Sequence, residues 1–292
     1  MTTGELERIP SEVPGRSGQH LGLRTRLSRV RALIWTAIGR PRGFFTQYAY
    51  TEHLQAVAEP YPEVEQHFAA SPFRGFLDDI QNLEADFASF GTRPADPVLG
   101  RGMFPALDGM AAYAAVRKFK PKTILEIGSG DSTFLLARGV KDNGLGRVIC
   151  IDPQPRREIL DLEVDFKQRL MVNADAETAG SLEANDILFI DSSHIMLPGM
   201  DVDIQFNRMF PRLKKGVIVH VHDIFLPFDY PPHWRVRNYS EQNALIGWIL
   251  SGFFEVIWPG HYVFSRHHNE AQKVLAKISP LQAAGSIWLR KT

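Results

Sequence analysis

The chain has 292 residues, of which 44% are hydrophobic and 23% are charged, a balance typical of a folded globular protein with a sizeable core. Its 33 basic and 33 acidic side chains cancel, so the sequence shows no strongly basic surface and no nucleic-acid partner is expected. The single cysteine, Cys150, excludes an intrachain disulfide framework and fits a reducing cytoplasm. It lies in an apolar run and is expected to be a small buried side chain.

The N-terminal third is predicted to be a tail followed by helices. Residues 1–20 are rich in Gly, Pro, Ser and Glu, which predicts a disordered tail, and they lack the features of a signal peptide. Residues 21–107 are expected to form a helical extension or lid. Within them, residues 24–45 form a basic amphipathic segment whose apolar stretch is too short to cross a bilayer. This segment fits a surface helix packed on its own protein, the commoner case, or peripheral contact with a membrane or an acidic partner.

A second helical pattern covers Phe73–Phe90. Its apolar residues recur at spacings of three and four, which predicts a stripe that docks on a core: Phe76, Leu77, Ile80, Leu83, Phe87 and Phe90. Pro94–Phe104 is expected to be a loop, and Asp108–Lys118 a helix that leads into the next domain.

Residues 108–292 are expected to form an α/β core, with its central part from about Pro121 to Arg266. Short apolar runs of strand length alternate here with helical stretches, at residues 123–126, 147–151, 170–175, 187–191 and 217–221. This alternation predicts a Rossmann-like, doubly wound parallel sheet. Two further runs, Phe253–Trp258 and Tyr262–Ser265, are separated by only three residues. They are therefore predicted to close the seven-stranded sheet as an antiparallel hairpin.

A glycine turn after the first strand predicts the cofactor site. The run Ile124-Leu-Glu126-Ile-Gly128-Ser129-Gly130-Asp-Ser132-Thr133 joins a strand to a helix through two glycines. A dinucleotide fingerprint would have glycine in place of Thr133, and a carboxylate at Glu126 would repel a pyrophosphate. S-Adenosylmethionine carries no phosphate, and its ammonium and sulfonium groups are cationic. The turn therefore favours this cofactor.

Two more acids extend the predicted cofactor site. Asp152 ends the second strand, where a carboxylate can accept both ribose hydroxyls. Asp175 ends the predicted third strand and could reach the adenine amino group. The predicted cofactor-binding residues are Glu126, Gly128, Ser129, Gly130, Ser132, Asp152 and Asp175.

The motifs resemble those of class I S-adenosylmethionine-dependent methyltransferases. The resemblance covers about half of the chain and is carried by three stretches, Lys120–Thr133, Phe189-Ile-Asp-Ser-Ser-His194 and Lys214–Asp223. It points to a bacterial group related to small-molecule O-methyltransferases. It implies a cytoplasmic methyltransferase, alone or as a homo-oligomer, acting on a small-molecule acceptor. It says nothing of residues 1–100, and it specifies the cofactor more closely than the acceptor.

Polar residues after the fourth and fifth strands predict the reaction site. Asp191 and His194 follow one strand, and His222 and Asp223 follow the next. In one mechanism Asp191, His222 and Asp223 hold a divalent metal, and His194 deprotonates the acceptor. The resemblance implies magnesium at this place, although His222 stands where an acid is usual and would also suit Mn, Fe or Zn. In the other mechanism no metal binds, and His194 or His222 is the general base, oriented by Asp191 or Asp223.

The surroundings of this site are open to alternative interpretations. His220 shares a face with His222 but is expected to be a hydrogen-bonded strand residue without a catalytic role. An aromatic loop after the fifth strand is expected to form the wall of the acceptor site, although it could equally be a lid. Its residues are Phe225, Phe228, Tyr230, His233 and Trp234. O-methylation of a small hydroxylated metabolite is the favoured function. The alternatives are an N-methyltransferase, although the Asn/Asp-Pro-Pro-Tyr/Phe motif of exocyclic-amine methylation is absent, or a non-catalytic protein that binds the cofactor.

Overall fold

The computed structural model describes residues 22–38, 59–93, 95–159 and 161–292. The chain forms two compact units, Met1–Ala56 and Val57–Thr292. In the first unit the described element is helix α1, Leu23–Ala37. The predicted tail at residues 1–20 lies outside the described residues, as do residues 39–45 of the basic segment. None of the described helices is long and apolar enough to span a membrane.

A seven-stranded sheet forms the centre of the second unit, in the order β3-β2-β1-β4-β5-β7-β6. Strands β1 to β5 run parallel to one another, whereas β7 is antiparallel to both of its neighbours, β5 and β6. This confirms the predicted Rossmann-like sheet with antiparallel C-terminal strands. The strands are β1 Thr123–Ile127, β2 Arg147–Ile151, β3 Asp165–Lys167, β4 Ile187–Ile190, β5 Ile218–Val221, β6 Phe254–Pro259 and β7 Ile287–Lys291.

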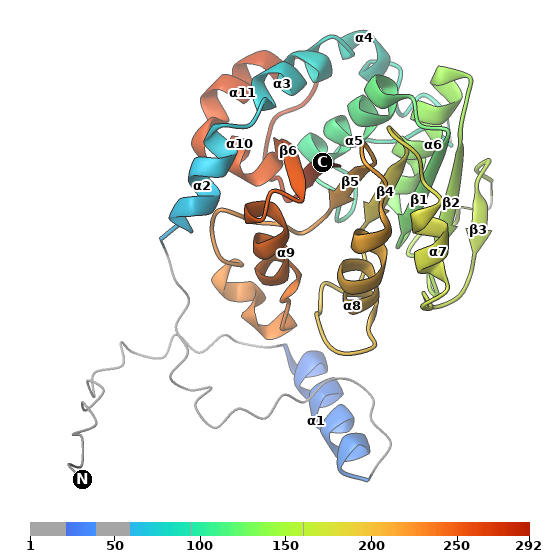
Figure 1. The fold of residues 1–292 in the computed structure, drawn as a ribbon, viewed down its shortest axis with the longest axis vertical. Coiled ribbons are helices and arrows are strands. Elements are labelled where there is room, and N and C mark those ends of the chain that lie inside the picture. The colour runs from blue at the N-terminus through green and yellow to red at the C-terminus, as the bar shows by residue number, and fades with distance from the viewer. Residues whose placement is uncertain (1–21, 39–58, 94, 160) are drawn as a thin grey trace. The chain divides into compact units, whose positions relative to one another are not determined.

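The central strands are mostly apolar because both faces of the sheet are covered. Every residue of β4 and β5 is buried, and in β1 only Thr123 is partly exposed. Figure 1 shows the sheet between two groups of helices, with α5 and α6 above it and α7, α8 and α9 below it. Helices α5 and α6 pack against each other on their side.

The helices of the second unit have the following bounds. They are α2 Pro62–Ala69, α3 Phe73–Gln81, α4 Glu84–Phe87, α5 Ala106–Phe119, α6 Asp131–Asn143, α7 Asp175–Gly180, α8 Asp201–Ile204, α9 Glu241–Leu250, α10 Gly260–Arg266 and α11 His268–Leu275. Helix α8 continues into a π-helical turn at Gln205–Met209 and a 3₁₀ turn at Phe210–Arg212, and a further 3₁₀ turn covers Pro232–Arg237.

Helices α2, α3 and α4 belong to the same compact unit as the sheet. The predicted Phe73–Phe90 stripe is divided between α3 and α4. Phe76 and Ile80 on α3 are fully or nearly fully buried, and α3 packs against α5, β6 and α11. Phe76 lies 5.5 Å from the ring of Trp258 on β6, so the stripe docks on the core as expected.

Two predicted strands are wrong. Residues 170–175 form a turn into α7, because the Asp175 carboxylate accepts the Val172 N–H and pairs with Arg169, and the side chains of Leu170 and Val172 are exposed. The third strand lies earlier, at Asp165–Lys167.

Residues Tyr262–Ser265 belong to helix α10 and do not form the second strand of a hairpin. The antiparallel partner of β6 is β7, which follows two helices later. A run of three apolar residues and a serine fits one turn of helix as well as a short strand, so its periodicity could not separate the two.

Candidate active site

The glycine turn lies where the order of strands reverses, between β1 and β4. Gly128 has φ +86°, and a Cβ atom there would lie 1.8 Å from the Asp191 carbonyl oxygen, in the loop that follows β4. Only glycine fits this close approach of two loops. In open α/β sheets, ligands bind at such a reversal, beyond the carboxyl ends of the strands.

Asp152 holds the glycine turn in place from the end of β2. Its Oδ2 atom accepts the backbone N–H of Ser129 at 2.7 Å and the Ser129 hydroxyl at 2.8 Å, and Oδ1 accepts the Gln154 N–H at 2.7 Å. Gly130 donates its N–H to the Thr133 hydroxyl at 3.0 Å, which explains why threonine suits that position. The turn and Asp152 therefore form one hydrogen-bonded unit.

A cavity of about 480 Å³ opens beside the glycine turn and Asp152. Its wall includes Gly128 and Ser129 after β1, Asp152 after β2, and Asp191 and Ser192 after β4. Three of the predicted cofactor-binding residues, Gly128, Ser129 and Asp152, thus share one cavity with the predicted catalytic residue Asp191. Gly130 and Ser132 line an adjoining hollow with Asp191.

Glu126 lies beneath the turn and does not face the cavity, contrary to its expected contact with the cofactor. Strand β1 extends past it to Ile127, and alternation directs Ile127 to the cavity and Glu126 into the core. The Glu126 carboxylate accepts the Ser132 hydroxyl at 2.7 Å and the buried Cys150 thiol at 2.9 Å. Burial raises the pKa of Glu126 to about 7 and also raises that of Cys150.

Asp175 is also separated from the cavity. It begins α7, its carboxylate is bound by both terminal nitrogens of Arg169, at 2.6 and 2.8 Å, and it is absent from the residues that line the cavity. Its pKa is lowered: burial alone would raise it, but Arg169 and the Val172 N–H outweigh burial. The expected contact with adenine depended on a strand that the chain does not form here.

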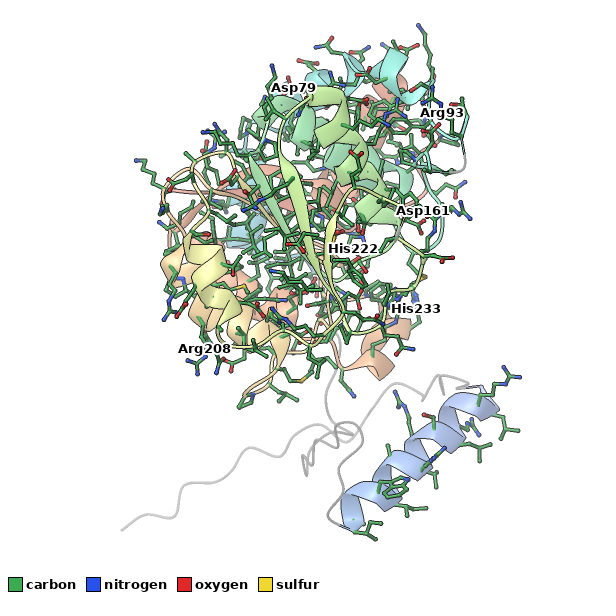
Figure 2. The ribbon with its side chains drawn as sticks, turned by 90° about the vertical axis from the view of Figure 1, so that its right-hand side faces the viewer. Asp79, Arg93, Asp161, Arg208, His222 and His233 are labelled. Atoms are coloured by element: carbon green, nitrogen blue, oxygen red, sulfur yellow. The ribbon has the colours of Figure 1, made fainter. Side chains whose placement is uncertain are left out.

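Asp191, His194, His222 and Asp223 come together beyond β4 and β5. His194 Nε2 lies 3.4 Å from Asp191 Oδ1 and 3.3 Å from Asp223 Oδ2. His222 Nδ1 lies 3.4 Å from Asp191 Oδ1 and 3.5 Å from Asp223 Oδ1. Both histidines are buried, and Figure 2 shows His222 well inside the molecule, whereas His233 lies near its edge.

Two further acids lie beside the outer nitrogens of these histidines, and the sequence reasoning missed both. Glu241, in the first turn of α9, lies 2.8 Å from His194 Nδ1, and Asp108, in the first turn of α5, lies 3.5 Å from His222 Nε2. Both acids are completely buried. Asp108 also accepts the N–H groups of Gly285 and Ser286 at 2.8 and 3.1 Å. A charged residue inside the apolar run of residues 106–115 was the available signal for Asp108.

The carboxylates set the protonation of the cluster. Burial would lower the pKa of His194, but Asp191 and Glu241 hold it well above its usual value. Burial would likewise lower the pKa of His222, but Asp191 and Asp108 outweigh burial and hold that pKa well above its usual value. The pKa of Asp191 lies well below its usual value because the two histidines outweigh burial. The pKa values of Asp223 and Glu241 are raised by burial.

The backbone at this site is unusual. His194 has φ +62° and Asp223 has φ +56°, the left-handed region that residues other than glycine seldom adopt. The His194 carbonyl accepts the N–H groups of Ser240 and Glu241 at 2.9 and 3.2 Å, and this ties the loop after β4 to the start of α9. Such conformations are frequent where a side chain must be held at a functional site.

His220 is a structural residue, as expected. Its Nε2 atom lies 2.9 Å from the Ser286 hydroxyl, and its ring stacks on Phe189 with 3.7 Å between the ring centroids. Complete burial lowers its pKa, so it stays neutral in the core.

A second cavity, of about 240 Å³, lies beside the first. Its polar wall contains Asp191, His194, His222 and Asp223, and Asp191 therefore borders both cavities. From the predicted aromatic wall, Phe225, His233 and Trp234 line it, joined by Met103 and Tyr239. Phe228 and Tyr230 do not; the buried Tyr230 hydroxyl accepts the Gln242 N–H at 3.1 Å.

The described residues contain no group of three His, Cys, Asp or Glu side chains arranged to hold a metal ion. Asp191 and Asp223 each lie within 3.5 Å of His222 Nδ1, so the three predicted ligands are close together. The metal site predicted at Asp191, His222 and Asp223 therefore stays a prediction.

Comparison with known proteins agrees with this geometry. Residues 125–224 match the family model described as a methyltransferase domain. None of the curated proteins compared with the chain matches its sequence.

One solved structure with a distant likeness is a putative O-methyltransferase from Klebsiella pneumoniae, with 15% identity over 77% of this chain and 93% of that chain and a TM-score of 0.43. A second is a putative caffeoyl-CoA O-methyltransferase from Staphylococcus aureus, with 16% identity over 73% of this chain and 92% of that chain and a TM-score of 0.42. Another is the O-methyltransferase from Bacillus cereus in complex with SAH, with 17% identity over 78% of this chain and 97% of that chain and a TM-score of 0.40. Because these identities and TM-scores are low, the assignment of the domain rests on the match to the family model and on the order of the strands in the sheet. Residues 125–224 thus match a methyltransferase domain, and they lie in a Rossmann-like sheet.

Proposed function

We propose that this enzyme transfers the methyl group of S-adenosylmethionine to a hydroxyl group of a small metabolite, with His194 as the general base. The larger cavity would hold the adenosyl part of the cofactor, with Asp152 facing the ribose. The smaller cavity would hold the acceptor. The observation that carries the proposal is that Asp191 borders both cavities and lies 3.4 Å from His194 Nε2.

The arrangement suits proton transfer from an acceptor hydroxyl. Glu241 binds Nδ1 of His194 and leaves Nε2 directed at Asp191 and Asp223, next to the acceptor cavity. His194 would take the hydroxyl proton at Nε2, and Glu241 would stabilise the resulting imidazolium. The cofactor, when bound, supplies an electrophilic methyl group with a sulfonium leaving group. The acceptor oxygen forms the new bond to carbon as the carbon–sulfur bond breaks, and the protein aligns the two and excludes water.

The raised pKa of His194 favours the protonated form of this residue in the free enzyme. The base must lose that proton before it can act, so the rate of methyl transfer should rise with pH on the alkaline side of neutrality. Bound cofactor would favour the same loss, because the positive sulfonium group and a protonated His194 repel each other.

The acceptor cavity favours a compact molecule with an apolar or ring-bearing part. Phe225, Trp234 and Tyr239 form its aromatic side, and the Arg237 guanidinium stacks 3.7 Å above the ring of Trp234. The histidines and acids form its polar side. A hydroxylated ring compound would place its ring on the aromatic side and its hydroxyl group near His194.

The test is methyl transfer from radiolabelled S-adenosylmethionine to a panel of hydroxylated metabolites and matched amines. We expect labelled product from hydroxyl acceptors, and we expect His194→Gln to lower kcat at least 100-fold while cofactor affinity stays within threefold. Label transferred to amines alone would support an N-methyltransferase instead. Tight cofactor binding without turnover on any acceptor would support the non-catalytic alternative.

Exhaustive chelation separates the two mechanisms predicted from the sequence. A metal-free reaction keeps full activity after chelation. Loss of activity that returns with one added divalent ion would restore the metal mechanism, with Asp191, His222 and Asp223 as its candidate ligands.

A further inference from the structure

Helix α1 presents a row of exposed apolar side chains. Leu23, Leu27, Val30 and Ile34 are between 54 and 73% exposed, although large apolar side chains are normally buried. Their spacings of four, three and four residues place them along one stripe of a helix that turns about 100° per residue. Such a continuous exposed stripe indicates an interaction surface.

Arginines flank this stripe on both sides. At the same 100° per residue, Arg26 falls along one edge of the stripe, Arg24 and Arg31 fall along the other, and Ser28 lies on the far face. The helix Leu23–Ala37 contains four arginines and no Asp or Glu. Arginine can lay its aliphatic stem along an apolar surface while its charge reaches outward. The surface that this helix fits is therefore apolar in the middle and anionic at its edges.

We propose that α1 lies in the surface of an anionic membrane, with the apolar stripe among the acyl chains and the arginines among the phosphates. Anionic lipid offers both parts of the matching surface, and the helix is a peripheral anchor, since no described helix is long and apolar enough to span. Pairing with α1 of a second copy is disfavoured because it would bring together the arginines that flank the two stripes, Arg24, Arg26 and Arg31 of each copy. This anchor is independent of the proposed acceptor and base.

The experiment uses the full chain and sedimentation with vesicles. Vesicles that contain phosphatidylglycerol and phosphatidylcholine should bind the protein, and vesicles of phosphatidylcholine alone should bind it at least tenfold more weakly. Raising the salt concentration from 0.1 to 1 M, values chosen for the assay, should weaken binding, since the Debye length falls from about 10 Å to about 3 Å. Equal binding to both vesicle types, or to neither, would overturn the proposal.

Two neighbouring substitutions provide a matched pair. Leu27→Gln removes an apolar side chain from the stripe and should lower the partition coefficient about tenfold. Ser28→Gln introduces the same side chain on the far face and should leave partition within twofold. The double variant Arg24→Gln/Arg31→Gln should lose the preference for anionic vesicles.

Two measurements on Leu27→Gln guard against other roles of the stripe. If the stripe packed on the protein itself, Leu27→Gln would lower the melting temperature and leave vesicle binding unchanged. If it joined two copies, light scattering would show a dimer that Leu27→Gln dissociates. Either result would overturn the membrane assignment, whereas an unchanged melting temperature and mass with reduced vesicle binding would support it.

Discussion

Replacing Glu241 with glutamine tests how the proposed base is tuned. Glu241 Oε2 lies 2.8 Å from His194 Nδ1, and both side chains are buried. At an effective dielectric constant of about 20, unit charges at this distance interact by about 6 kcal/mol. Even a quarter of that energy, about 1.5 kcal/mol, changes proton affinity by slightly more than tenfold. Glutamine keeps an acceptor for the Nδ1 proton and removes only the charge.

We therefore expect Glu241→Gln to lower the proton affinity of His194 at least tenfold. The assay is an NMR titration of the protein with ¹³C in its ten histidines, with the His194 signal assigned by its absence from His194→Gln. The rising limb of the pH–rate profile should move to lower pH in parallel, and its plateau should fall 10- to 100-fold because the imidazolium is less stabilised. The control is Glu255→Gln, which alters an exposed acid on β6. A His194 titration that is the same in wild type and Glu241→Gln would refute the reasoning.

The other predictions concern the cofactor site. Gly128→Ala places a Cβ atom against the Asp191 carbonyl and should weaken S-adenosylmethionine binding at least tenfold in calorimetry; wild-type affinity would contradict the close approach. Asp152→Asn should weaken the same affinity about tenfold through its contact with the ribose, and an unchanged titration would remove Asp152 from the site. Glu126 binds its proton more tightly when folded, with a pKa of about 7 against 4.5 unfolded, so its contribution to stability is complete below pH 4.5 and is lost as the pH rises through 7. Urea unfolding should therefore show that Glu126→Gln gains about 3 kcal/mol relative to wild type between pH 4.5 and 8; a constant difference would show that Glu126 has an ordinary pKa.

Much of the sheet could be predicted because its strands are buried on both faces. The runs that end at Ile127, Ile151, Ile190 and Val221 are mostly apolar, and this pattern is typical of a parallel sheet. Asp165–Lys167 gave no such signal, because it is a three-residue edge strand with no fully buried position. Edge strands depend on tertiary pairing more than on local composition.

The sequence could predict only the part of the candidate site that lies at the ends of the strands. Asp191 and His222 follow apolar strands, and chain order alone places them at one edge of the sheet. Glu241 and Asp108 reach the same place from helices distant in sequence, so no local pattern links them to the histidines. Glu126 was predicted to end the first strand, but β1 continues to Ile127. Because successive side chains of a strand point to opposite faces, this difference of one residue places Glu126 in the core and not at the cavity.

The most direct test of the account is a crystal structure of the protein with S-adenosylhomocysteine. We predict that the adenosine lies in the larger cavity beside Asp152 and that the sulfur atom lies next to Asp191, on the side of His194. A product molecule bound outside this cavity, or with its sulfur turned away from His194, would contradict the assignment of both cofactor site and base.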